Sequence, residues 1–312
     1  MNNRKIEWVD ISKGIVICLM VIGHSSIPAL LSHWIWSFHM PFFFIISALF
    51  TSWNKGTFEE FSIRRAKILM IPFVVYSMIN IVGFAFVRDQ TIIEYSTTIL
   101  FSGWGGVALW FVPVFYISLL VCKLTSDRLL LIIALASLIL GCVLSYCTVV
   151  LPWALSSVPF AVFLMMLTRR YRNIILRFLK SLTARFLFLI SIAGIIFSAF
   201  IGDHWTLDMS WNRILPITPI LIGILCGTTS IICISIMLTK NRRIFTIIGT
   251  PFMSIGRNTY EIMAISQVAI AVLNNWFNDY VALKYALLIA VIILAVYIRK
   301  IIEGKFANTE AI

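Results

Sequence analysis

The stretch DISKGIVICLMVIGH, residues 10–24, combines an apolar run with three ionisable side chains. Its middle is apolar enough to enter a bilayer, but Asp10 and Lys13 lie near one end and His24 closes the other. Such side chains raise the free energy of a helix in hydrocarbon, and in membrane proteins they usually face the bundle interior and take part in function. The stretch therefore predicts a membrane helix that carries functional residues.

Apolar runs of similar length recur along the whole chain. Its 312 residues are 61% hydrophobic and 12% charged, and about 20 apolar residues suffice to cross the hydrocarbon core of a bilayer. The runs 92–103 and 244–255 are too short to cross and are expected to be re-entrant or interfacial. We predict an all-α, polytopic membrane bundle of about ten transmembrane helices, at residues 11–31, 35–53, 67–87, 105–122, 129–147, 150–168, 186–202, 214–238, 259–276 and 280–300.

The chain is expected to form one transmembrane domain over residues 1–312, without a separate soluble domain. It shows no internal repeat and no low-complexity linker. The first apolar run is interrupted by Asp10 and Lys13, and no small-residue cleavage site follows it, so this run is expected to stay attached. No pair among the six cysteines has metal-ligand spacing, which indicates that they are small buried apolar residues.

The formal net charge of +12 reflects membrane topology. With the amino terminus in the cytoplasm, all of the 25 Lys and Arg residues except Arg88, Arg213 and Lys284 fall at or near the cytoplasmic face, as the positive-inside rule requires. A basic loop predicted at 169–185 is the extreme case, and contact with anionic lipids accounts for most of it. The charge thus indicates orientation and membrane lipids as partners, and does not indicate nucleic acid binding.

Lys13 and His24 are expected on one face of the first helix. They are eleven positions apart, which at about 100° per residue brings them within about 20° of each other. Asp10 lies within one turn of Lys13, but about 21 Å from His24 along the axis. Asp10 is therefore expected to pair with Lys13 at the cytoplasmic edge rather than to orient His24. An interfacial ion pair with a snorkelling lysine is the structural alternative for these two residues.

A second histidine is expected at the depth of His24. If the chain reverses near residue 31, antiparallel packing sets His24 level with His39. Pro28 and Pro41 each leave a carbonyl group one turn earlier without its helical donor, and such groups need a cavity or a partner inside a membrane. We predict a polar cavity, open toward the outer leaflet, that holds both histidines. The alternative is a pair of hydrogen-bonded structural histidines, and two histidines without a third ligand do not indicate a metal site.

Five stretches of the sequence resemble the membrane-bound acyltransferase-3 family, whose members typically O-acetylate cell-surface glycans. The specific element is a basic residue, ten intervening residues and a histidine, followed by Phe-His-Met-Pro. The stretches occur in the family's order over most of the chain: EWVDISKGIVICLMVIGHS (7–25), WSFHMPFFFIISALF (36–50), RRAKILMIPF (64–73), LWFVP (109–113) and IGRNTYEIMAI (255–265).

The resemblance implies a ten-helix bundle in a bacterial inner membrane that moves acetyl from cytoplasmic acetyl-CoA to a glycan or lipid-linked sugar hydroxyl on the other side. It implies His24 as the catalytic histidine, Lys13 as the basic residue of the same motif, and His39 as the histidine of the second helix. A histidine is also the side chain whose ordinary pKa suits a general base near neutrality. We predict that His24, His39, Lys13 and Asp10 form the catalytic set. Whether acetyl or a slightly larger group is transferred, directly or through a covalent histidine, stays open.

A basic segment before the third span is expected to bind the acyl donor. Arg64, Arg65 and Lys67 fall where the family would contact CoA, and the anionic phosphates of CoA require fixed cations at the inner face. Among the outer segments, the loop at 202–213 carries Asp203, His204 and Asp208. Contact with a glycan is one role for these residues, but exposed loop residues are usually solvated, and we place them outside the catalytic set.

One departure from the family lies in the ninth span. Relatives usually have a histidine about ten residues after the position of Gly256, whereas this chain has Ser266 followed by Gln267. If that histidine contacts the acceptor in relatives, acceptor choice differs here. A relative that binds glycan or CoA without turnover is therefore one alternative.

The alternative of another class is a transporter or proton-coupled carrier. Intramembrane Asp, Lys and His residues also form proton relays, and a midplane cavity between broken helices is typical of carriers. The absence of visible repeats and the concentration of polar residues in the first two spans favour the enzyme.

Overall fold

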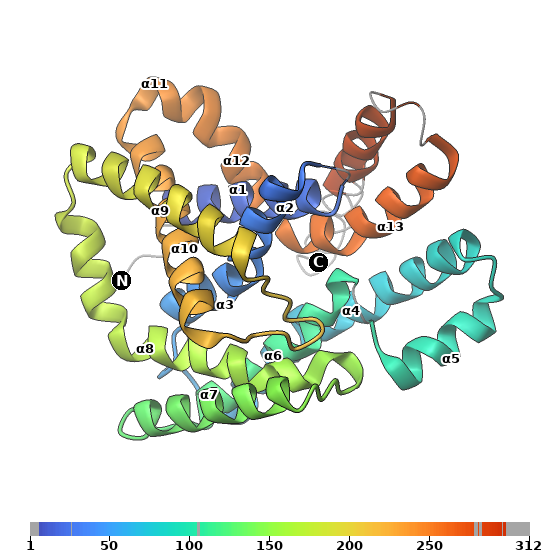
Figure 1. The fold of residues 1–312 in the computed structure, drawn as a ribbon, viewed down its shortest axis with the longest axis horizontal. Coiled ribbons are helices and arrows are strands. Elements are labelled where there is room, and N and C mark those ends of the chain that lie inside the picture. Colours follow the sequence, from blue (N-terminus) through green and yellow to red (C-terminus); the bar gives the residue numbers. More distant parts are fainter. Residues whose placement is uncertain are drawn as a thin grey trace, which may run out of the picture.

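The computed structural model describes residues 6–25, 27–104, 107–277, 280, 283–294 and 296–297. The described residues form an all-α fold whose elements are α1 (Glu7–Gly23), α2 (Ala29–Trp36), α3 (His39–Phe50), α4 (Phe58–Val87), α5 (Ile92–Ser102), η1 (Ala108–Trp110), α6 (Phe111–Leu124), α7 (Leu130–Tyr146), η2 (Pro152–Ser157), α8 (Val158–Ser181), α9 (Ala184–His204), α10 (Ile217–Lys240), α11 (Arg242–Ile244), η3 (Phe245–Gly249), α12 (Thr250–Gly256) and α13 (Thr259–Phe277). Figure 1 shows α1, α2 and α3 near the middle, with α7 and α8 along one edge and α5 and α13 at another.

The predicted all-α, polytopic membrane bundle is confirmed, and the chain is an integral membrane protein. Among the described residues, five helical stretches are long and apolar enough to cross a membrane: Ala29–Phe50, Phe58–Val87, Pro152–Ser181, Ala184–His204 and Ile217–Lys240. Shorter apolar helices lie at Ala108–Leu124, Leu130–Tyr146 and Leu283–Leu294.

The predicted span 11–31 is wrong at its carboxyl end. α1 ends at Gly23 with His24 as its C-cap, and α2 begins after Pro28. A proline lacks the N–H that would continue the helix and moves the preceding residue out of the α region. The first helix therefore ends several positions earlier than expected, and α2 leads directly into α3.

Two helices are longer than predicted. α4 begins at Phe58 because Thr57 and Glu60 form a capping box: the Glu60 N–H donates to Thr57 Oγ1 (3.2 Å), and the Thr57 N–H donates to the Glu60 carboxylate (3.1 Å). α8 continues to Ser181, so most of the predicted basic loop at 169–185 is helical. No glycine or proline interrupts this part of α8, and its straight-chain residues favour a helix.

α1 and α12 cross at two glycines. A Cβ atom on Gly256 would lie 1.7 Å from the carbonyl oxygen of Asp10, and one on Gly14 would lie 1.9 Å from the carbonyl oxygen of Phe252. Only a hydrogen at these positions allows such a close approach of two helix backbones. The crossing sets Arg257 beside Asp10.

Asp10 joins two cations at this crossing. Its Oδ1 lies 2.8 Å from Lys13 Nζ, and its Oδ2 accepts a hydrogen bond of 3.1 Å from Arg257 Nε. The predicted pair of Asp10 with Lys13 is confirmed, and Arg257 is an additional partner from the far end of the sequence. The contact between Asp10 and Arg257 holds the beginning of α1 against the segment before α13.

The connection between α9 and α10 folds against the bundle, and Figure 1 shows it running over the middle of the molecule. Asp208 and Arg213 form an isolated antiparallel bridge, with backbone N–H···O distances of 3.0 and 2.8 Å. Leu207, Met209 and Asn212 are buried. Asp203 and His204 are exposed, as expected, whereas Asp208 is half-buried because the apolar side chains of Leu207 and Met209 anchor this part of the connection to the core.

Candidate functional site

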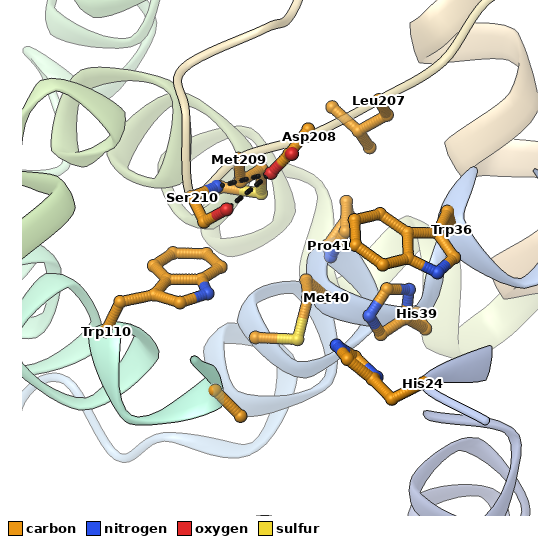
Figure 2. Close-up of a pocket in the computed structure, with 11 residues that line it drawn as sticks. His24, Trp36, His39, Met40, Pro41, Trp110, Leu207, Asp208, Met209 and Ser210 are labelled. Atoms are coloured by element: carbon orange, nitrogen blue, oxygen red, sulfur yellow. Dashed lines mark hydrogen bonds between the residues drawn. The ribbon is translucent and has the colours of Figure 1, made fainter. Parts of the chain in front are cut away.

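His24 and His39 lie side by side where α1 ends and α3 begins. Their ring centroids are 6.1 Å apart with ring planes 81° apart. The Trp36 ring lies 5.3 Å from His24 and 5.8 Å from His39, as Figure 2 shows. The prediction that the two histidines share one depth is confirmed, although α1 ends earlier than expected.

Backbone carbonyl groups fix the orientation of both imidazoles. Nδ1 of His24 lies 2.8 Å from the carbonyl oxygen of Met20, and Nδ1 of His39 lies 2.9 Å from that of Ile35. Because a carbonyl oxygen only accepts, each Nδ1 carries a proton and each neutral ring keeps its lone pair on Nε2. Neither Nε2 has a hydrogen-bond partner in the described part of the chain. Both lone pairs are therefore available to a ligand.

The two histidines line a small cavity of about 30 Å³, the histidine cavity (Figure 2). Its volume is enough for one water-sized group, so it accommodates a hydroxyl group but not a whole sugar ring. The walls come from three parts of the chain: the α1 to α3 region (His24, Trp36, His39, Met40 and Pro41), η1 (Ala108 and Trp110) and the α9–α10 connection (Leu207, Asp208, Met209 and Ser210).

Asp208 is a wall residue that the sequence alone does not identify. Its side chain lines the same cavity as His24. Its Oδ1 accepts hydrogen bonds from the Ser210 N–H (3.0 Å) and the Ser210 hydroxyl (2.6 Å), which Figure 2 shows as dashed lines. The available signal is the Asp-x-Ser turn at 208–210, which follows Leu207 and has Met209 as its middle residue, a pattern typical of an ordered loop.

Gln267 supports the cavity wall at η1. Its side-chain oxygen accepts a hydrogen bond from the backbone N–H of Ala108, which lines the histidine cavity. Ser266 is buried, and its hydroxyl lies 3.5 Å from the carbonyl oxygen of Met263. The residue that holds the wall, Gln267, is therefore the neighbour of Ser266, which occupies the position where the family pattern has a histidine.

Lys13 lines a second cavity of about 160 Å³, the inner cavity. Apart from Lys13 and a few polar groups, this cavity is apolar, with Phe43, Phe111 and Phe115 among its walls. It borders the histidine cavity, because Phe111 lines one cavity and the preceding Trp110 lines the other. Lys13 thus belongs to a neighbouring space rather than to the histidine cavity itself.

The basic residues of α4 occupy different faces of that helix. Arg65 shares a face with Phe61 and Leu69, both buried, and its Cζ lies 5.4 Å from the centroid of the Phe61 ring. Leu69 lines the inner cavity. Arg64 and Lys67 are exposed.

A cation from α6 joins this group. Lys123 Nζ lies 5.6 Å from the centroid of the Phe61 ring, and it donates to the carbonyl oxygens of Trp53 (2.7 Å) and Gly56 (3.0 Å). Lys123 was not expected from its position at the end of an apolar run.

In the described ranges, no group of three His, Cys, Asp or Glu side chains has the geometry to hold a metal ion. Comparison with known families matches residues 6–299 to an acyltransferase domain of the acyltransferase-3 type. Comparison with curated proteins and with solved structures gave no match.

Proposed function

Because the chain belongs to the acyltransferase-3 family, we propose that it transfers acetyl from cytoplasmic acetyl-CoA to a hydroxyl group of a bacterial surface polysaccharide or lipid-linked glycan. The observation that carries this proposal is the pair of carbonyl-anchored histidines in a cavity that accommodates one hydroxyl group. The family resemblance supports the bacterial inner membrane as the protein's location, and the distribution of Lys and Arg supports an amino terminus in the cytoplasm.

His24 is the proposed general base. Its Nε2 removes the proton of the acceptor hydroxyl while the hydroxyl oxygen attacks the thioester carbonyl. The C–S bond then breaks, the acetyl group stays on the acceptor oxygen, and the proton held by His24 passes to the CoA thiolate. Protons and electrons balance without another reactant.

His39 and Asp208 stabilise the protonated form of His24. A neutral His39 with its lone pair on Nε2 can accept a hydrogen bond from the imidazolium, and the carboxylate of Asp208 lies within electrostatic reach of the same ring. Both effects favour the charged state that forms during attack.

The acyl donor approaches from the inner cavity. Its aromatic walls suit the apolar part of the pantetheine arm, and Lys13 at its edge supplies a charge for the anionic end of CoA. Arg65 lies one helical turn from Leu69, a wall residue of that cavity, so it is the next cation along the donor path. Arg64 and Lys67 add charge at the exposed surface.

Acetyl transfer in membranes tests the proposal. Labelled acetyl-CoA is supplied to membranes of the native host that contain the wild type, His24→Ala or His204→Ala at matched protein levels. His204 is exposed, with a hydrogen bond to its own helix and ring contacts to Phe200 and Trp205, so it controls for loss of a histidine. Wild type and His204→Ala should label glycan, and His24→Ala should not. A wild type that labels no glycan overturns the proposal, and glycan movement without acetyl-CoA consumption supports a carrier.

A further inference from the structure

A third cavity of about 530 Å³, the Arg88 cavity, lies next to the histidine cavity. Its volume falls within the roughly 300–1,000 Å³ typical of sites for small ligands. Residues of α5, η2 and the segment around Trp104 line it, together with Arg88 at the end of α4. Neither the family match nor the histidine chemistry assigns it a ligand.

The Arg88 cavity adjoins the histidine cavity through two segments. Ser210 lines both spaces. Val107 lines the Arg88 cavity, while the next residue, Ala108, lines the histidine cavity. A ligand in the larger space could therefore place one of its groups past Ser210, next to His24 and His39.

Arg88 gives this cavity a positive charge. Its Cζ lies 5.2 Å from the centroid of the Tyr95 ring and 5.8 Å from that of Phe84, so two aromatic rings hold the guanidinium in place. No carboxylate forms an ion pair with Arg88 within the described residues, and no described Asp or Glu lines the cavity. A guanidinium without a carboxylate partner can bind the phosphate or carboxylate of a ligand, because its N–H groups match the geometry of these anions.

The remaining walls suit a sugar. Trp104 is fully buried, and its indole N–H has no hydrogen-bond partner in the described part of the chain. Trp211 is 44% exposed and offers a flat apolar face at the cavity. Thr98 and Ser102 add hydroxyl groups. Aromatic faces with a few polar groups are the lining that fixes the orientation of a polar ring.

We propose that the Arg88 cavity binds the acceptor, and that the acceptor is an acidic saccharide. Arg88 contacts its phosphate or carboxylate, Tyr95 and Trp211 pack against its sugar ring, and the reacting hydroxyl passes Ser210 into the histidine cavity. This assignment rests on the proposed acetyl transfer and adds the substrate class. Phosphate from a lipid-linked sugar and carboxylate from an acidic polysaccharide share this chemistry.

Separated acceptor fractions test the assignment. Host glycan is divided into an organic-soluble lipid-linked fraction, an acidic polysaccharide fraction and a neutral fraction. The purified full-length wild type, Arg88→Gln, Arg88→Lys and Arg213→Gln are assayed on each fraction with labelled acetyl-CoA. Arg213 is exposed and lies outside the cavity lining, so Arg213→Gln removes the same charge from the adjoining segment without touching the site.

The wild type should acetylate one of the two acidic fractions, and the fraction identifies phosphate or carboxylate as the group bound. Arg88→Gln should raise the half-saturating acceptor concentration about tenfold, as expected for one lost charge-assisted contact, and leave that of acetyl-CoA unchanged. Arg88→Lys should recover part of the loss, and Arg213→Gln should match the wild type.

Acetylation of the neutral fraction alone, or an Arg88→Gln enzyme equal to the wild type, overturns the acidic acceptor while the acetyl-transfer proposal stands. A wild type inactive on every fraction overturns both. If Arg88→Gln does not fold, Trp211→Ala replaces it, because this side chain is partly exposed. An unchanged half-saturating acceptor concentration in Trp211→Ala then counts against the site.

Discussion

His24 and His39 meet with 6.1 Å between ring centroids, and each donates its Nδ1 proton to a backbone carbonyl. The Nε2 lone pairs of both rings are therefore free for one proton from the acceptor. His24 sits in the connection after α1, whereas His39 is buried in the first turn of α3. This difference assigns the two rings unequal roles.

Substitution of the two histidines should separate these roles. Loss of a general base typically reduces the rate by about 10² to 10⁴, so we expect His24→Gln to lower kcat about 10³-fold. His39→Gln keeps a hydrogen-bonding amide and should lower kcat less, by about 10². Rates of acetyl transfer at saturating acetyl-CoA measure both effects, and His33→Gln, which alters an exposed histidine paired with Asp203, should match the wild type. A larger loss for His39→Gln than for His24→Gln would show that the roles are reversed.

Asp208 should influence the rate through its charge. Asp208→Asn keeps an oxygen that can accept from Ser210 but removes the negative charge from the wall of the histidine cavity. We expect kcat to fall about tenfold, which corresponds to a change of one pKa unit in the stability of protonated His24. The half-saturating acetyl-CoA concentration should not change. Asp203→Asn removes an exposed carboxylate and should leave kcat unchanged.

A second substitution separates charge from structure at the same position. Asp208→Ala removes the hydrogen bonds to Ser210 as well, so it should also lower the temperature of thermal unfolding. Full activity in Asp208→Asn together with a loss in Asp208→Ala would mean that Asp208 only shapes the loop.

The elements that the sequence predicts well are those with simple boundaries. α7 and α9 match their predicted spans to within two residues at each end, because each is an apolar run that begins after a short polar segment. The first span is mispredicted because apolar residues such as Leu30 continue after Pro28. Hydropathy therefore predicts one helix, whereas the chain forms two, α1 before Pro28 and α2 after it. The start of α4 is missed because its first turns are polar and only the capping box marks them.

The residues of the site also differ in how well local sequence patterns predict them. His24 and His39 are predictable because the spacing of one motif and its neighbour brings them together within a short segment. Asp208 lines the cavity and Gln267 holds its wall at Ala108. Both come from distant parts of the chain, and their positions depend on how the α9–α10 connection and α13 pack. Local patterns do not contain that information, so the carboxylate near His24 emerges only from the fold.

The donor site should depend on Arg65 more than on its neighbours. The Arg65 guanidinium lies over the buried Phe61 ring, and its Nε has no partner among the described residues, whereas Lys67 is exposed. Charges at exposed positions are screened by solvent and salt. We expect Arg65→Gln to raise the half-saturating acetyl-CoA concentration about tenfold and Lys67→Gln about twofold, with kcat retained in both. Equal effects would show that only overall surface charge attracts the donor.

The crossing of α1 and α12 should be the part of the fold least tolerant of a methyl group. A Cβ on Gly256 would approach the Asp10 carbonyl oxygen to 1.7 Å and the Gly14 nitrogen to 2.8 Å, and both are backbone atoms that cannot rotate away. Gly256→Ala must therefore separate the two helices and stretch the contact between Arg257 and Asp10.

We expect Gly256→Ala to destabilise the protein by about 2 kcal/mol or more, measured as thermal unfolding of the purified protein in detergent. Gly141→Ala is the matched control, because the nearest atoms to its Cβ would be 3.4 Å away, an ordinary van der Waals contact. Alanine also has a higher helix propensity than glycine. The control should unfold within a degree or two of the wild type, since substitutions without strain change stability by about 0.5 kcal/mol or less. A Gly256→Ala variant as stable as Gly141→Ala would mean that α1 and α12 lie farther apart in the folded protein and that Asp10 does not need Arg257 as its partner.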